Sequence, residues 1–345
     1  MNVTDVRIAS ALQLHGRASW DQIARVLGLP ERTVARRGQR LLDEAVIRVT
    51  GVVDTQLLGR PEPVLLRLEG RTGGGPDTAR ALSAIQETRT VLTLLGSSDY
   101  FVELVPHSRE SLRDLVYRGL PTQVRSSSSY PVLMFYSATH TWNGGALTEG
   151  EAARLRRPAL PPFGSRNGGV TLQQDELDMI ALLVEDGRIP TTRLAAALGI
   201  SQSTASRKLS ALLESGAVRV RADVTPSLFG LHTEALLWLQ VSFRHLDEVG
   251  EALARRPEVM TLVSISGDYQ VCAHVAVADH RSLQRFLVDV VGPLAVSELD
   301  TTIVLETFKR GGRTAIRRPA SLPFNSDRDG VAHAADSSAG DDAHD

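Results

Sequence analysis

The sequence predicts an α+β protein made of two tandem copies of one module, each a winged helix-turn-helix followed by a βαββαβ domain. The first observation is an internal repeat, because residues 4–59 align without a gap on residues 175–230, with fifteen identities among 56 positions. The second is the spacing of apolar residues, which changes within each copy from helical to alternating. The identities include turn glycines, core leucines and arginines: Leu12/Leu183, Gly16/Gly187, Arg17/Arg188, Ala24/Ala195, Leu27/Leu198, Gly28/Gly199, Arg36/Arg207, Leu41/Leu212 and Gly59/Gly230.

The second copy contains the clearer helix-turn-helix. Pro190 can open its second helix, and Gly199 can end that helix because glycine accepts a left-handed backbone. Ser201 can cap the third helix through its side-chain oxygen. The expected elements are a first helix ending at Asp186-Gly187, a second helix Thr192–Leu198, a third helix Gln202–Glu214 and a wing strand Arg219–Val224.

The first copy repeats this plan with two differences. Ser19 and Gln22 have the spacing of a capping box for the second helix, and Gly28 provides the turn. Pro30 stands where the second copy has its serine cap, and proline is acceptable at the start of a helix. Gly38 lies inside the third helix and costs about 1 kcal/mol relative to alanine. We therefore expect the first copy to be the less stable.

Both third helices expose a polar face opposite their apolar one. Val34 and Leu41 are expected to face inward in the first copy, and Ala205, Leu209 and Leu212 in the second. A solvated helix face would explain the outer residues, but an arginine in the same outward position twice favours contact with double-stranded DNA. The residues expected to contact DNA are Arg32, Thr33, Arg36, Arg37 and Arg40, and Gln202, Ser203, Thr204, Ser206, Arg207 and Lys208.

The second half of each module reads strand, helix, strand, strand, helix, strand, which is the ferredoxin-like order. The first copy is expected to form Val64–Leu68, Asp77–Thr88, Val91–Leu95, Tyr100–Val105, Glu110–Arg118 and Tyr130–Tyr136. The second is expected to form Ala235–Phe243, Leu246–Arg256, Glu258–Ser266, Tyr269–Val277, Arg281–Val291 and Glu298–Phe308. In this alignment the loop Ser97–Tyr100 corresponds to the turn Gly267–Tyr269.

The whole pattern resembles the Lrp/AsnC (feast/famine) family of transcription regulators, in a tandem form known from actinobacteria. The residues that carry the resemblance are Asp186-Gly187-Arg188, Leu194-Ala195, Leu198-Gly199-Ile200-Ser201, Arg207, Gly216-Ala217-Val218 and Gly267-Asp268-Tyr269. The resemblance implies a sequence-specific DNA-binding regulator that responds to an amino acid or similar metabolite and forms homo-oligomers through its ferredoxin-like domains.

The resemblance also implies an effector site at the turn before the third strand of that domain. The expected effector-binding residues are Asp99, Tyr100, Gly267, Asp268 and Tyr269. Asp268 could receive the ammonium group of an amino acid, and Asp99 likewise. The alternative is that glycine and aspartate simply form a tight turn between two strands.

An enzyme remains the alternative function, because sirohaem decarboxylases resemble this family in fold and domain order. The histidines show no metal-ligand spacing and no matched pair between the copies. Retention of basic outer faces on both third helices favours a regulator. We therefore expect no catalytic residues, no metal and no cofactor.

The domain prediction divides the chain into six parts. The net charge of −2 also conceals an acidic end, since residues 327–345 carry six aspartates and one arginine. The expected parts are helix-turn-helix domains at 1–58 and 171–229, ferredoxin-like domains at 59–138 and 230–310, a linker with a short helix at 139–170, and a disordered acidic tail at 311–345.

Bulk features favour a cytoplasmic protein, nucleoid-associated when bound to DNA. The first residues lack the basic and apolar regions of a signal peptide. The longest apolar stretch, around Ala235–Phe243, is too short to span a bilayer, so no membrane partner is expected. The single cysteine, Cys272, fits a reducing compartment and is expected to be a small buried strand residue.

Overall fold

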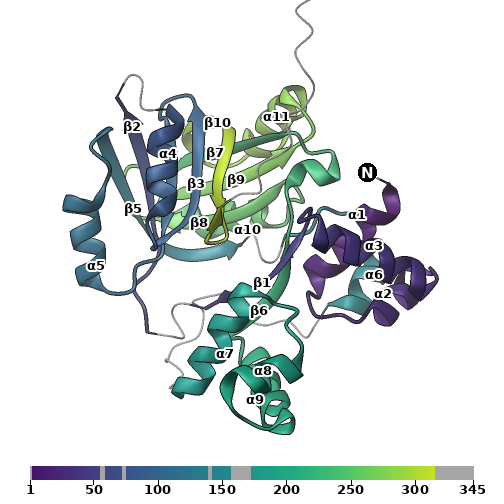
Figure 1. Cartoon of the computed structure of the whole chain (residues 1–345). Helices are drawn as coiled ribbons and strands as arrows, with labels where there is room; N and C mark the ends of the chain where they lie inside the picture. Colours follow the sequence, from purple (N-terminus) through teal and green to yellow (C-terminus); the bar gives the residue numbers. More distant parts are fainter. Residues whose placement is uncertain (1, 55–58, 72–74, 139–141, 157–171, 315–345) are drawn as a thin grey trace, which may run out of the picture. The chain divides into compact units, whose positions relative to one another are not determined.

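The computed structural model describes residues 2–54, 59–71, 75–138, 142–156 and 172–314 (Figure 1). Residues 315–345 of the expected acidic tail and most of the second half of the linker therefore lie outside the described residues. The predicted start of the tail at residue 311 is wrong, because Arg313 and Thr314 form a short strand that pairs with the strand ending at Arg310. The helix-turn-helix and βαββαβ elements both occur twice, in the predicted order. A short helix, α6 (Glu149–Leu155), stands in the linker with Thr148 as its cap, as expected.

Both helix-turn-helix units form from the local signals in the sequence. Gly28 and Gly199 have φ of 65° and 64°, the left-handed conformation predicted at both turns. Ser19 and Ser201 accept hydrogen bonds from the backbone amides three residues later, whereas Pro30 caps without one. The elements are α1 (Val3–Leu14), α2 (Trp20–Leu27), α3 (Glu31–Asp43) and β1 (Arg48–Val53), then α7 (Gln174–Glu185), α8 (Thr191–Leu198), α9 (Gln202–Ser215) and β6 (Val218–Asp223).

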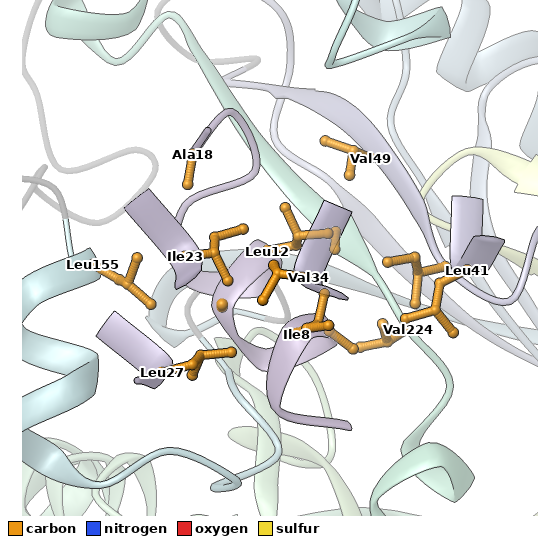
Figure 2. Close-up of a cluster of buried hydrophobic side chains, with 14 of the residues drawn as sticks. Ile8, Leu12, Ala18, Ile23, Leu27, Val34, Leu41, Val49, Leu155 and Val224 are labelled. Atoms are coloured by element: carbon orange, nitrogen blue, oxygen red, sulfur yellow. The ribbon is translucent and has the colours of Figure 1, made fainter. Parts of the chain in front are cut away.

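The first unit has a compact apolar core that residues from outside the unit complete (Figure 2). Ile8, Leu12 and Val34 are fully buried in it. Leu155 of the linker helix and Val224, which follows the second wing strand, belong to the same cluster. The inward positions predicted for both third helices are confirmed, since all five residues named for them are buried.

The two wing strands pair with each other. β1 and β6 form an antiparallel two-stranded sheet in which Arg48 lies opposite Asp223 and Val53 lies opposite Val218. Val53 packs against the core of the second unit, while Ala222 and Val224 pack in the core of the first. Each wing thus completes the core of the other copy, a pairing that the sequence patterns do not predict.

The ferredoxin-like elements occur in the predicted order in both copies. The first comprises β2 (Val64–Gly70), α4 (Gly75–Ala84), β3 (Thr88–Leu95), β4 (Tyr100–Leu104), α5 (Arg109–Asp114) with a π-helical turn (Leu115–Gly119), and β5 (Val124–Ser137). The second comprises β7 (Thr233–Val241), α10 (Leu246–Ala254), β8 (Val259–Ile265), β9 (Val271–Val277), α11 (His280–Phe286) with a π-helical turn (Leu287–Val291), and β10 (Val296–Arg310).

The two sheets join into one barrel. The strand order is β11-β10-β3-β4-β2-β5-β8-β9-β7, with β11 (Arg313–Thr314) at the end, and an additional pairing of β10 with β7 closes the ring (Figure 1). β5 of the first copy pairs with β8 of the second, and β10 of the second pairs with β3 of the first. Closure removes the exposed edges that each four-stranded sheet would otherwise have. Cys272 is buried inside the barrel, as predicted.

Several predicted boundaries are wrong for identifiable reasons. The helix expected at Asp77–Thr88 ends at Ala84, because Thr88 already begins β3. The strand expected to reach Phe243 ends at Val241, and Phe243 lies exposed in a short 3-10 helix. β5 begins six residues before the expected Tyr130, since residue 124 and the serine run 126–129 pair with β2 although these serines are exposed.

Gly38 has a packing function that its helix propensity does not reveal. A Cβ atom at this position would lie 2.4 Å from the ring of Trp20, so glycine is what allows α2 and α3 to approach. Its predicted cost is therefore compensated by contact with a large aromatic side chain.

Candidate functional site

The outer face of α3 divides into exposed and ion-paired arginines. Arg32 and Arg36 are exposed, and Thr33 is half-buried. Arg37 and Arg40 each donate a hydrogen bond of 2.9 Å to Asp5, whose side chain is buried beneath them. Burial alone would raise the pKa of Asp5, but the hydrogen bond and charge of Arg37, with the charge of Arg40, lower it.

The outer face of α9 is mostly small and polar. Gln202, Ser203, Ser206 and Arg207 are exposed, and Thr204 is half-buried beside the cap. Polar side chains in this arrangement can donate to and accept from base edges, which differ in their hydrogen-bonding groups in the major groove.

Lys208 has the same structural role in the second copy that Arg37 has in the first. Its Nζ lies 3.0 Å from Asp175 and 3.8 Å from Glu176. The offset of 171 relates Arg37 to Lys208 and Asp5 to Glu176. Both basic residues therefore fix the third helix of their unit to the first helix. In the sequence, this contact is indicated by an acidic residue at the start of each first helix.

A second pair of basic residues, Arg17 and Arg188, joins the two units to each other. Arg17 donates to the carbonyls of Gly187 and Ile189 at 2.6 and 3.0 Å. Arg188 donates to those of Gly16 and Ala18 at 2.7 and 3.0 Å. The sequence shows that this arginine is identical in the two copies. Its role in joining the units follows only from the contact between the copies.

Gly16 and Gly187 allow this contact between copies because each lies against the backbone of the opposite wing. A Cβ on Gly16 would lie 2.8 Å from Arg221 backbone, and one on Gly187 would lie 3.0 Å from Thr50 backbone. The amide of Gly16 donates to Val220, and that of Gly187 donates to Val49. The two helix-turn-helix units are thus related by an approximate two-fold symmetry that includes individual hydrogen bonds.

The turn at the expected effector site has a different register from the predicted one. Gly267 has φ of 137°, and its counterpart is Gly96, with φ of 146°. The strand pairs agree, because Thr93 lies opposite Tyr100 and Ser264 lies opposite Val271, a shift of 171 in both. Ser97 therefore occupies the position of Asp268, and the predicted correspondence of the two Asp-Tyr pairs is wrong.

The side chains at these turns have different environments. Asp268 is exposed and Tyr269 is half-buried. Asp99 accepts a hydrogen bond of 2.7 Å from the amide of Gly70, and the buried Tyr100 donates to the carbonyl of Gly75. Asp99 and Tyr100 thus hold the first domain together, while the side chain of Asp268 is exposed to solvent.

Next to these turns, Arg67 connects the two sheets. It donates to Ser97 at 2.6 Å and to Asp300 at 2.5 Å. Its guanidinium lies 4.9 Å from the ring centroid of Trp238 and 5.5 Å from that of Tyr269. Burial works to lower the pKa of Arg67, but the hydrogen bond and charge of Asp300 raise it. The cluster keeps a cation fixed beside the Gly267–Tyr269 turn.

Three family models match parts of the chain. The Lrp/AsnC ligand-binding domain matches residues 234–314, the AsnC-type helix-turn-helix domain matches residues 1–42, and a winged helix-turn-helix DNA-binding domain matches residues 176–219. The matches place DNA-binding domains in both modules and a ligand-binding domain in the second.

Relatives agree with these models. The transcriptional regulator FL11 of Pyrococcus abyssi is 31% identical over 39% of this chain and 91% of its own length. The regulator AldR of Mycolicibacterium smegmatis is 30% identical over 33% of this chain and 71% of its own. The chain is a helix-turn-helix transcriptional regulator of the Lrp/AsnC family. Each relative matches about one module of this regulator.

A solved structure shares the arrangement of both modules. The sirohaem decarboxylase NirDL superposes with a TM-score of 0.59 over 90% of this chain and 93% of its own, at 16% identity. At this identity the similarity concerns the fold. Among the described residues of the regulator, no helix combines the length and apolarity that crossing a membrane requires.

Proposed function

We propose that this regulator binds double-stranded DNA through α3 and α9 and changes its binding when a small amino-acid-like metabolite contacts the Gly267–Tyr269 turn. The observation that carries the proposal is the repetition of Arg36 at Arg207, both exposed on the outer face of a third helix. Neither forms an ion pair or hydrogen bond within the described part of the chain.

Arg207 provides the direct test. Arg207→Ala should weaken operator binding by about 1–3 kcal/mol if the side chain contacts a base edge, while the melting temperature stays nearly constant. Arg281→Ala, an exposed arginine of α11, is the matched control, and fluorescence anisotropy is the measurement. Equal affinity of Arg207→Ala, Arg281→Ala and wild type would contradict the assignment of α9 as a recognition helix.

The two recognition helices should contribute differently. In the first copy Arg32 and Arg36 are available for phosphates, whereas Arg37 and Arg40 are engaged with Asp5. Replacing Arg32 and Arg36 by alanine should reduce the slope of log K against log salt by about 0.9 for each lost phosphate contact. The preferred half-site of α9 should persist. A changed preference with an unchanged slope would contradict this division.

Asp268 should carry the effector response. It is exposed at a left-handed glycine turn within the region that matches the ligand-binding family model. A panel of amino acids, tested on the wild-type protein, first identifies the one that changes DNA binding. Asp268→Asn should abolish the effect of that amino acid. DNA binding in the absence of any amino acid should be unchanged. Asp289→Asn, an exposed carboxylate of the same domain, is the control. A retained response in Asp268→Asn would reduce Asp268 to a turn residue.

Association between chains through the ferredoxin-like domains is supported by exposed apolar residues in equivalent positions. Tyr117 and Val288 are 80% and 64% exposed, and Met134 and Leu305 are 44% and 62% exposed. The offset of 171 relates both pairs, so the apolar patches repeat about the two-fold relation of the barrel. Sedimentation equilibrium of Tyr117→Ser/Val288→Ser should show a smaller assembly than wild type.

A decarboxylase is the second candidate function, favoured by the NirDL fold match over 90% of the chain. The cavity inside the barrel is about 110 Å³, below the about 300–1,000 Å³ of sites for drug-sized ligands, and a tetrapyrrole is at least that large. The barrel cavity is therefore too small for a tetrapyrrole, and we propose a non-catalytic regulator. When sirohaem is mixed with the regulator, the absorbance spectrum of the sirohaem should stay unchanged and no carbon dioxide should be released. A changed spectrum or release of carbon dioxide would favour the enzyme.

A further inference from the structure

The cavity in the barrel is lined by two different parts of the regulator. Apolar side chains of the barrel strands, among them Leu65, Phe101 and Leu236, form one wall. Thr50 and Val52 of the wing strand β1 also line it, together with Arg221 of the wing strand β6. A molecule in this space would contact the effector domains and the wings at once.

Most charged groups of the lining have partners. Arg89 is ion-paired with Glu103, which also accepts a hydrogen bond from Thr90. Arg310 donates to Glu234 at 2.7 Å and holds that carboxylate charged: burial works to raise the pKa of Glu234, but the positive charge of Arg310 outweighs burial and brings the pKa to about 2. These cations are neutralised within the protein.

Arg221 differs from the other arginines of the lining. It is 5% exposed, and its Nε donates to the carbonyl of Ala222 at 3.2 Å. Its Nη1 is buried and has no hydrogen-bond partner in the described part of the chain. Burial lowers the pKa of Arg221 to about 10, so the guanidinium is still charged at neutral pH.

The charge of the nearest acidic residue, Asp223, acts on Arg221, but burial outweighs it. Asp223, on the same strand and in the same lining, forms no ion pair with Arg221 within the described residues. Burial raises the pKa of Asp223, although Arg310 and Arg221 act in the opposite direction. A buried cation without a hydrogen-bonded anion costs several kcal/mol, and an anionic ligand would remove that cost.

We propose that this cavity binds a small monocarboxylate with a short apolar chain, its carboxylate on Arg221 and its chain among Leu65, Phe101 and Leu236. A cavity of about 150 Å³ accommodates benzene, which has six non-hydrogen atoms, so in proportion about 110 Å³ holds roughly four to five. The four carbons of butyrate match this number, with the two carboxylate oxygens placed on Arg221. The site lies among different residues from the Gly267–Tyr269 turn.

Because Arg221 belongs to a wing strand, occupancy of the cavity is coupled to the helix-turn-helix units. β6 pairs with β1, and the backbone of Arg221 packs against Gly16 of the first unit. A carboxylate on Arg221 fixes the wing pair against the barrel. This coupling rests on the proposed DNA-binding function, whereas the carboxylate site in the cavity does not. Thermodynamic linkage requires that the carboxylate changes the affinity for DNA by the same factor as DNA changes the affinity for the carboxylate.

Calorimetric titration of the full chain with butyrate tests the site, with butan-1-ol as the uncharged analogue that has the same four-carbon chain. We expect one butyrate per chain and no detectable butan-1-ol binding at the same concentrations. Arg221→Gln should weaken butyrate binding at least tenfold, and Arg219→Gln, on the same strand outside the lining, should not. Failure of wild type to bind butyrate, or equal binding by Arg221→Gln or of butan-1-ol, overturns the proposal.

A second measurement needs no substitution. Cys272 is the single cysteine of the sequence and lines the cavity, so its rate of modification by methyl methanethiosulfonate reports access to this space. Butyrate should slow the modification at least threefold and butan-1-ol should not; equal rates overturn the site even where Arg221→Gln fails to fold. Saturating butyrate should also shift the Kd for DNA at least threefold. An unshifted Kd overturns the coupling alone, and a chain that binds butyrate but no DNA contradicts the proposed function alone.

Discussion

Replacing Arg188 should loosen the contact between the two helix-turn-helix units without unfolding either. Arg188 donates two hydrogen bonds to carbonyls of the first copy, and its guanidinium lies 4.5 Å from the ring centroid of Trp20. Burial and the neighbouring charge of Arg17 lower the pKa of Arg188, which shows that its charge is shielded from water. Arg188→Met keeps the apolar stem and removes the guanidinium with its contacts.

The magnitude follows from the contacts that are lost. Hydrogen bonds to charged donors contribute about 1.5–3 kcal/mol each, and a cation–π contact contributes about 0.5–2 kcal/mol. Two changes act in the opposite direction: the repulsion between Arg188 and Arg17 disappears, and water can reach the released carbonyls. We therefore expect Arg188→Met to destabilise the contact by about 2–4 kcal/mol, less than the sum of its parts.

Amide hydrogen exchange measures this contact locally. The amides of Gly16 and Gly187 donate to the opposite wing, so they exchange when the contact opens. A loss of about 2–4 kcal/mol corresponds to roughly 30- to 1,000-fold faster exchange at these two glycines. Arg193→Met, an exposed arginine of α8, should leave exchange within about twofold of wild type. If both variants exchanged equally fast, Arg188 would not hold the units together.

Three further predictions concern packing and charge. Gly38→Ala should destabilise the first unit by about 1–3 kcal/mol in urea denaturation, because its Cβ collides with Trp20, whereas Gly150→Ala, at an exposed helix position with open space, should not. The pKa of Glu234 is lowered to about 2, so its stabilising effect is complete above the unfolded pKa near 4.5 and should disappear as the pH falls toward 2. In Glu234→Gln, the free energy of unfolding should therefore depend less on pH between about 4.5 and 2. Arg67→Met and Asp300→Asn should show a coupling energy of about 1–3 kcal/mol in a double-mutant cycle, and additive effects would show that their hydrogen bond contributes little.

The helices of the regulator could be predicted because local signals specify them. Gly199 must be left-handed, Ser201 can cap only a helix that follows it, and the apolar spacing of Ala205, Leu209 and Leu212 fixes the buried face. All of these depend on residues within a few positions of one another. The same holds for the order of strands and helices in the ferredoxin-like domains.

The contacts between copies could not be predicted, since they join residues about 170 positions apart. Nothing near Val53 or Val224 in the sequence indicates that each packs in the core of the other unit. Arg37 is predicted to contact DNA from its position on the third helix, whereas its ion pair with Asp5 follows only from the packing of the first helix beneath it. The matching Lys208 and Glu176 are a detectable signal, because a charge pair that recurs at the repeat offset indicates a contact within the module.

Tandem fusion allows the two copies to differ where they face each other. The offset of 171 relates Arg67 to Trp238, and their side chains contact across the barrel at 4.9 Å. In a symmetric dimer of one module, each position near the two-fold axis faces its own copy, so arginine would face arginine and the charges would repel. Fusion permits a cation over an aromatic ring instead, a favourable contact that only two different residues can form. The same freedom leaves Arg221 in one wing strand with Thr50 as its counterpart in the other, so the two wing strands contribute a cation and a neutral side chain to the lining of the cavity. The asymmetry of the buried charges is therefore a consequence of joining two modules in one chain.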